Sequence, residues 1–135
     1  MPRAPISDLE SWISELKHSG KLILVEGVKD KKALAHFGIR NIEALSGRPL
    51  YKVADDIAAK AKDVVILTDL DREGKRLYSI LRTMLSRLGV RVDAFFREFL
   101  FKSTQLKQIE GLVSYSGKDA EKRQFTPHNP SQRHL

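Results

Sequence analysis

Three acidic residues follow short apolar runs and are the residues best placed to do chemistry. Glu26 follows the run 22–25, and Asp69 and Asp71 follow the run 64–67. Asp69 and Asp71 are two residues apart, so an extended backbone points both carboxylates the same way. Two like charges held this close together call for a cation.

The donor atoms indicate which cation this is. Carboxylate oxygens without a nearby histidine or cysteine suit a hard ion, and Mg²⁺ typically takes one or two protein carboxylates plus waters and phosphate oxygens. The chain has no cysteine, and its four histidines show no ligand spacing, so disulfides and thiolate metal sites are excluded. We therefore expect Mg²⁺ at the acidic residues, with Mn²⁺ as an alternative.

The segment 69–74 also has a simpler explanation as the start of a helix. Aspartate is favoured just before a helix, where it caps the first turn and faces the positive end of the helix dipole, so Asp71 could be an ordinary N-cap. Asp30 and Glu73 could add to the metal shell or only favour helix starts. Taken alone, the Asp-x-Asp pattern leaves both explanations open.

Alternating apolar runs and helical stretches must position these carboxylates. The periodicity predicts helices at 8–18 (with Ser7 and Glu10 as a capping box), 29–37, 50–61 and 77–88, and strands at 21–27, 41–45, 63–71 and 90–96. Strands joined by helical crossovers form a parallel sheet covered on both faces, here a four-stranded α/β sandwich. Ligands bind such sheets beyond the carboxyl ends of the strands, where Glu26, Asp69 and Asp71 fall.

The chain divides into four parts on this basis. We expect an N-terminal amphipathic helix at 1–20 packed on the core, the α/β domain at 21–100, a C-terminal helical extension at 101–123, which Ser103 or Thr104 could cap, and a disordered tail at 124–135. No apolar run is long enough for a membrane span and no secretory signal is visible, so the cytoplasm is the expected compartment.

The charge balance favours a polyanionic partner. Lysine and arginine number 24 against 17 aspartates and glutamates, a net charge of +7. Lys29, Arg48, Arg72 and Lys75 fall in loops or first helical turns at the same edge as the carboxylates, where they could hold a nucleic-acid backbone. Each could instead be a solvated surface charge, and Arg72 could neutralise the acidic residues.

Two segments together resemble the signatures of Toprim domains, in the same order. The first is Val25-Glu26-Gly27 with Asp30, and the second is Asp69-Leu70-Asp71-Arg72-Glu73-Gly74. The resemblance covers roughly residues 20–100. In length and pattern it is closest to the stand-alone Toprim proteins of archaea and bacteria and to the Toprim part of the 5S ribosomal RNA maturase.

The resemblance implies the Toprim fold and assigns roles to residues. Glu26, Asp69 and Asp71 would bind one or two Mg²⁺ ions, and Glu26 would also act as general acid or base. The implied function is phosphodiester hydrolysis by a Mg²⁺-dependent nuclease or RNA-processing enzyme, with RNA preferred over DNA. The alternative is a non-catalytic, Mg²⁺-dependent nucleic-acid-binding module of an RNA-processing assembly. A nucleotide-handling phosphoryl transferase is disfavoured, because the sequence contains no Walker loop and no GxGxxG.

Overall fold

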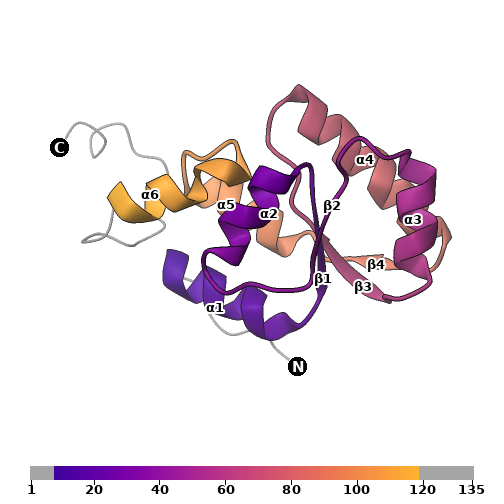
Figure 1. The fold of residues 1–135 in the computed structure, drawn as a ribbon, viewed down its shortest axis with the longest axis horizontal. Helices are drawn as coiled ribbons and strands as arrows, with labels where there is room; N and C mark the ends of the chain where they lie inside the picture. Colours follow the sequence, from indigo (N-terminus) through magenta and orange to yellow (C-terminus); the bar gives the residue numbers. More distant parts are fainter. Residues whose placement is uncertain (1–7, 119–135) are drawn as a thin grey trace.

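The structure, a computed structural model, describes residues 8–118. Four short parallel strands form the centre of this part of the chain (Figure 1). The strands are β1 (Leu22–Val25), β2 (Ile42–Ala44), β3 (Asp63–Ile66) and β4 (Arg91–Val92). The helices are α1 (Leu9–Ser19), α2 (Val28–Ala35), α3 (Leu50–Ala58), α4 (Arg72–Arg87), α5 (Phe95–Ser103), the 3₁₀ turn η1 (Ile109–Gly111) and α6 (Leu112–Lys118). None of these helices is both long and apolar enough to cross a membrane.

The strand order of the sheet is β2-β1-β3-β4, and all neighbouring strands are parallel. From β1 the chain moves outward through α2 to β2. It then returns past β1 through α3 and continues on the other side through β3 and α4 to β4. The direction of winding therefore changes between β1 and β3, and an open parallel sheet binds its ligands at such a switch point.

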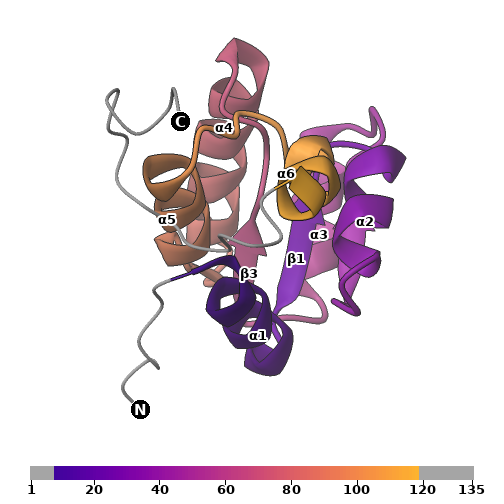
Figure 2. The same ribbon diagram turned by 90° about the vertical axis from the view of Figure 1, so that its left-hand side faces the viewer.

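Helices cover both faces of the sheet, which explains why the strands read as continuous apolar runs. One face packs against α1, α2, α5, η1 and α6, and the other against α3 and α4. Figure 2 shows the first group of helices in front of the sheet. Alternate residues of β1 serve the two cores, with Ile23 and Val25 in the first and Leu22 and Leu24 in the second. The expected four-stranded parallel α/β fold is confirmed.

The strand expected at 90–96 is wrong beyond its first residues, since β4 is Arg91–Val92 and α5 begins at Phe95. Asp93 ends the strand: its backbone N–H donates to the Val64 carbonyl, and its carboxylate accepts from the Phe95 N–H at 3.0 Å. Phe95 and Phe99 then stack one helical turn apart, with ring centroids 5.6 Å from each other. The apolar residues in this segment follow a helical period rather than a strand period.

The first helix also begins differently from the prediction. Its N-cap is Asp8, not Ser7: the Asp8 carboxylate accepts from the Ser11 N–H at 2.8 Å, and the Asp8 N–H donates to the Ser11 hydroxyl at 3.2 Å. The capping box is thus Asp8 with Ser11.

The extension after α5 is less helical than expected. Thr104 does not begin a helix, because its hydroxyl donates to the Leu100 carbonyl and accepts from the Leu106 N–H, and the chain then runs without regular structure to η1. The end of the extension and the tail expected at 124–135 lie outside the described residues.

Trp12 gives a test of the packing between α1 and α5. It is fully buried, and its indole N–H donates to the Phe96 carbonyl at 3.0 Å. Trp12→Phe keeps an apolar ring but removes the donor and some volume, so we expect the free energy of unfolding to fall by about 1–2 kcal/mol in urea titrations. The control Tyr51→Phe, at a side chain that is 62% exposed, should leave it unchanged. Equal stability of Trp12→Phe and wild type would contradict this role.

Candidate metal centre

The structure brings the two acidic segments together at the switch point. Glu26 lies directly after β1, and Asp69 and Asp71 lie in the loop between β3 and α4. The backbone N–H of Asp69 donates to Glu26 Oε2 at 2.6 Å, across a separation of 43 residues in the chain. This hydrogen bond links the ends of β1 and β3 directly.

A backbone N–H holds one oxygen of each carboxylate. Besides the Glu26 contact, Asp69 Oδ1 accepts from the Ile109 N–H at 2.9 Å, and Asp71 Oδ1 accepts from the Gly74 N–H at 2.7 Å. Asp71 is therefore the N-cap of α4, which confirms that part of the simpler explanation. The second oxygen of each carboxylate receives no hydrogen bond from any residue in the range 8–118.

Burial and mutual repulsion disfavour the charged form of two of these groups. Partial burial, helped by the nearby carboxylates of Asp30, Glu26 and Asp71 and opposed by the Ile109 N–H, raises the pKa of Asp69 to about 6. The pKa of Glu26 is also raised, chiefly by burial and then by Asp71, while the Asp69 N–H opposes the shift. The site therefore concentrates negative charge that a bound cation would relieve.

Two observations bear differently on metal binding. Within residues 8–118, no group of three or more histidine, aspartate or glutamate side chains is arranged so that it could hold a metal ion without rearrangement. The raised pKa values nevertheless show that Glu26, Asp69 and Asp71 act on one another through space. Mg²⁺ needs few protein ligands and completes its shell with water and phosphate oxygens. Three hard carboxylates with unengaged oxygens are a donor set that fits this ion.

Arg97 is a component of the site that the sequence analysis missed. Its side chain is buried (9% exposed), with Nε donating to the Thr68 carbonyl at 3.0 Å and Nη2 to the Asp69 carbonyl at 2.7 Å. The guanidinium also lies over the rings of Tyr78 and Phe101. Burial lowers the pKa of Arg97, and the nearby Tyr78, Glu26 and Asp69 oppose this shift, so Arg97 places a buried positive charge close to the acidic residues.

Gly74 allows α4 to start directly against the Asp69 backbone. A side chain at this position would collide with the carbonyl and amide atoms of Asp69. The Thr68 hydroxyl also donates to the Gly74 carbonyl at 2.7 Å. Gly27, by contrast, has room for a side chain, so close packing requires glycine only in the second acidic segment.

The segment before η1 and η1 itself lie against the acidic residues. The Leu70 N–H donates to the Lys107 carbonyl at 2.7 Å, next to the contact between the Ile109 N–H and Asp69. Asp30 is buried, accepts from the Gly27 N–H at 3.0 Å and also from the backbone N–H of Glu110. Asp30 thus joins the start of α2 to the C-terminal segment.

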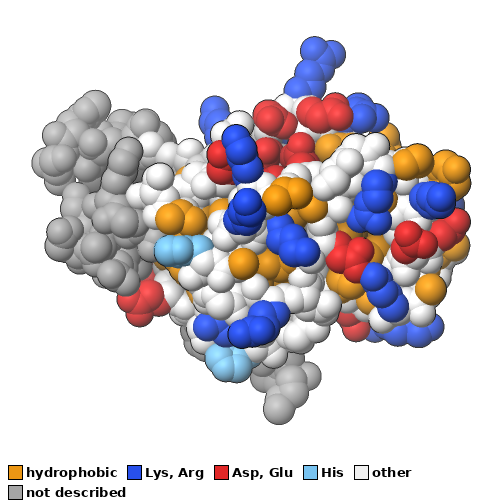
Figure 3. All heavy atoms as spheres, viewed as in Figure 1, with side chains coloured by type: hydrophobic (Ala, Val, Ile, Leu, Met, Phe, Trp, Pro, Cys, Tyr) orange, Lys and Arg blue, Asp and Glu red, His pale blue; other side chains and the backbone are white. Residues whose placement is uncertain are grey.

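The four basic residues expected at this edge differ in their surroundings. Lys29, Arg72 and Lys75 are exposed in the first turns of α2 and α4, and none forms an ion pair within the described residues. The Arg48 guanidinium donates to the Ala44 and Leu45 carbonyls at 2.7 and 3.2 Å, at the end of β2. Figure 3 shows acidic side chains gathered at the upper edge of the molecule, above α2 and the start of α4, with lysines and arginines around them.

The fold and the site define a small parallel α/β domain with a glutamate after its first strand and an Asp-x-Asp pair after its third. Residues 21–99 match the Toprim domain family, and the chain belongs to this family. Toprim domains are associated with metal binding and with nucleic acid.

Relatives of similar length are found among archaea. The UPF0292 protein of Methanocaldococcus jannaschii is 32% identical over 112 residues, which cover 78% of this chain and 88% of that protein. The UPF0292 protein of Pyrococcus abyssi is 40% identical over 104 residues, covering 76% and 77%. A solved structure of a protein from Aquifex aeolicus superposes with a TM-score of 0.71 and 41% identity, covering 81% of this chain and 98% of that one. None of these names states a substrate or a reaction.

The raised pKa of Asp69 predicts how stability depends on pH. The pKa is about 6 in the folded protein against an ordinary 3.8, so this group's stabilising contribution is complete below about pH 4 and is lost as the pH rises through about 6. Asp69→Asn does not titrate there. In chelator, the variant should be more stable than wild type above about pH 6, by on the order of 1 kcal/mol after allowing for solvent screening.

Urea unfolding at several pH values checks this. Glu26→Gln should differ from wild type in the same direction, since the pKa of Glu26 is raised too. A stability difference between Asp69→Asn and wild type that stays constant across this pH range would show that Asp69 is not under electrostatic strain.

Arg97 gives a second test of the charge balance. Arg97→Met removes two hydrogen bonds to backbone carbonyls and the counter-charge of the acidic residues, so the free energy of unfolding should fall by about 2–4 kcal/mol. The loss should be smaller in an Asp69→Asn background, where less negative charge needs compensation. Arg76→Met, which breaks only an exposed ion pair with Glu73, should leave the stability close to that of wild type. Equal losses with and without Asp69 would limit Arg97 to a packing role.

Proposed function

We propose that this protein is a Mg²⁺-dependent nuclease that hydrolyses phosphodiester bonds in RNA. Glu26, Asp69 and Asp71 hold one or two Mg²⁺ ions, which Mn²⁺ can replace. The proposal is carried by the hydrogen bond from the Asp69 N–H to Glu26 Oε2, because it holds the two acidic segments at one point of the sheet edge. A cytoplasmic location agrees with the absence of cysteine from the sequence.

The carboxylates have distinct tasks in this reaction. Bound Mg²⁺ supplies Lewis acidity toward the phosphate oxygens on which negative charge develops. Glu26 accepts or donates the proton. Its pKa is raised and so lies closer to neutral pH, where a general acid or base is most effective. The Asp69 N–H occupies Glu26 Oε2, so Oε1 is the oxygen that remains for the ion or for proton transfer.

Other residues orient the site and hold the substrate. Arg97 fixes the Thr68 and Asp69 carbonyls, and so sets the direction in which the Asp-x-Asp loop leaves β3. The exposed cations Lys29, Arg72 and Lys75 contact phosphates on either side of the scissile bond. Arg48 adds positive charge at the end of β2 while its guanidinium remains bonded to backbone carbonyls.

One observation supports a second function, a Mg²⁺-dependent RNA-binding module without turnover. Backbone N–H groups of the C-terminal segment already bond the carboxylates of Asp69 and Asp30. A site closed in this way could bind metal and RNA while excluding the geometry that hydrolysis requires.

Cleavage assays separate the two functions. Wild type should cleave labelled RNA in Mg²⁺ or Mn²⁺ but not in chelator, whereas Glu26→Gln, Asp69→Asn and Asp71→Asn should each lower the rate by at least about 100-fold. Asp55→Asn, a charge-matched change on the exposed face of α3, should cleave like wild type. Metal-dependent RNA binding with intact RNA would select the binding module. Cleavage that survives in Asp69→Asn would overturn the proposed metal site.

A further inference from the structure

The outer face of α4 is unusually basic. Its exposed residues carry positive charges or hydroxyl groups in every turn: Arg72, Lys75, Arg76, Ser79, Arg82, Thr83, Ser86 and Arg87. The one acidic residue of this helix, Glu73, is paired with Arg76 at 2.9 Å. The residues recur at spacings of three and four, so they share one side of the helix.

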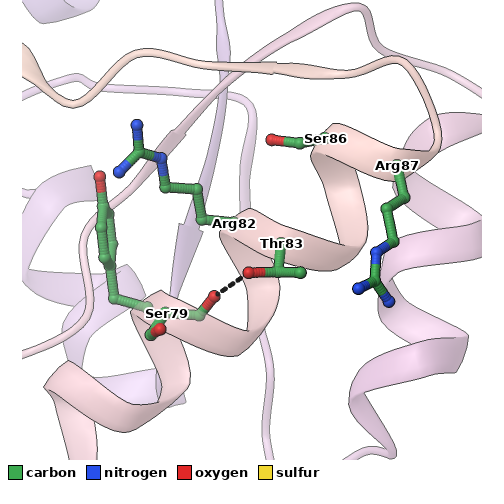
Figure 4. A pocket seen from close by; sticks show the side chains of 6 residues that line it. Ser79, Arg82, Thr83, Ser86 and Arg87 are labelled. Atoms are coloured by element: carbon green, nitrogen blue, oxygen red, sulfur yellow. Dashed lines mark hydrogen bonds between the residues drawn. The ribbon is translucent and has the colours of Figure 1, made fainter.

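A shallow groove of about 420 Å³ lies on this face toward the end of α4. Its lining residues are Tyr78, Ser79, Arg82, Thr83, Ser86 and Arg87. Figure 4 shows Thr83 and Ser86 between the two arginines, which extend to opposite sides, and Ser79 one turn earlier on the helix. Hydroxyl and guanidinium groups together are typical donors to phosphate oxygens.

The positive charge of this face is not balanced locally. Within the described residues, Arg72, Lys75, Arg82 and Arg87 form no ion pair with any acidic side chain. On the exposed side of α3, by contrast, Lys52 lies in the same short helix as Asp55 and Asp56. The α4 face is therefore the better complement for a polyanion.

The geometry of α4 joins this face to the metal centre. The helix begins immediately after its N-cap Asp71, and its 16 residues extend for about 24 Å. At about 3.4 Å per nucleotide of a stacked strand, that length matches roughly seven nucleotides. One strand of a duplex winds through about two thirds of a turn over this distance, so its phosphates would turn away from a straight row of cations. A single strand can run along the row.

We propose that the outer face of α4 binds the sugar-phosphate backbone of single-stranded RNA and leads it to the acidic site. This inference rests on the proposed function for the identity of the ligand, but the binding itself needs no hydrolysis. Arg82 and Arg87 contact phosphates several nucleotides from the scissile bond. The hydroxyls of Ser79 and Ser86 donate to phosphate oxygens near them, whereas the Thr83 hydroxyl donates to the Ser79 carbonyl at 3.0 Å.

Binding of a fluorescein-labelled oligouridine of about 12 nucleotides, measured by anisotropy in chelator, tests this without cleavage. Arg82→Gln/Arg87→Gln should raise the Kd by about 10-fold or more and lower the slope of log K against log salt by about 1.4, which is 0.7 for each lost contact. Arg82→Lys/Arg87→Lys should keep most of the slope. The matched control Arg40→Gln/Lys52→Gln removes the same charge from exposed positions outside α4, and should change the Kd by less than about 2-fold.

The outcomes distinguish this inference from the proposed function. Equal weakening by the α4 variant and by its control would overturn the inference, because net charge alone would then explain binding. Tighter binding of a duplex than of oligouridine would also overturn it. If wild type cleaves RNA but the α4 variant binds as wild type does, the inference fails and the nuclease stands. If the α4 variant loses binding although wild type never cleaves, the inference stands and the nuclease fails.

Discussion

The main constraint on this molecule is a group of partly buried carboxylates. They lie close together with no neutralising side chain between them. Glu26 and Asp69 approach closely enough for the Asp69 N–H to bond the Glu26 carboxylate, and burial raises the pKa of both. The protein offsets the repulsion with backbone N–H groups and with the Arg97 guanidinium, which donates to the Asp69 carbonyl. The parallel sheet supplies the rigidity, since its strands are buried on both faces.

Local patterns were enough to predict most of the fold and the three central carboxylates. The apolar runs before Glu26 and Asp69 are too short for helices, and the helical stripe after Asp71 is long, so the order of elements follows from the sequence. The strand predicted for residues 90–96 was wrong beyond its first residues, and the reason is specific. Valine and phenylalanine fit a strand or a buried helix equally well, and the decisive contact is the bond from the Phe95 N–H to Asp93.

The sequence did not predict Arg97 or the Ile109 N–H as parts of the site. Contacts between residues far apart in the chain bring both of them there. Arg97 lies 28 residues from Asp69 in the chain, and Ile109 lies 40 residues from it. An arginine between phenylalanines has no periodic signature that separates a buried counter-charge from a solvated one. The Ile109 contact is made by a backbone N–H, which any residue except proline provides, so side-chain identity carries no information about it.

The helix-capping and metal-binding explanations of Asp71 are compatible in this geometry. Capping occupies only Oδ1, through the Gly74 N–H, and it fixes the carboxylate at the edge of the sheet. The first turn of α4 also lies against the Asp69 backbone, where a side chain at position 74 would collide. The same turn directs the positive end of the helix dipole toward the acidic residues and begins the basic face of α4. One structural feature, the close start of α4, therefore stabilises the acidic loop, fixes the carboxylate that we propose as a metal ligand and begins the face that we propose binds a phosphate backbone.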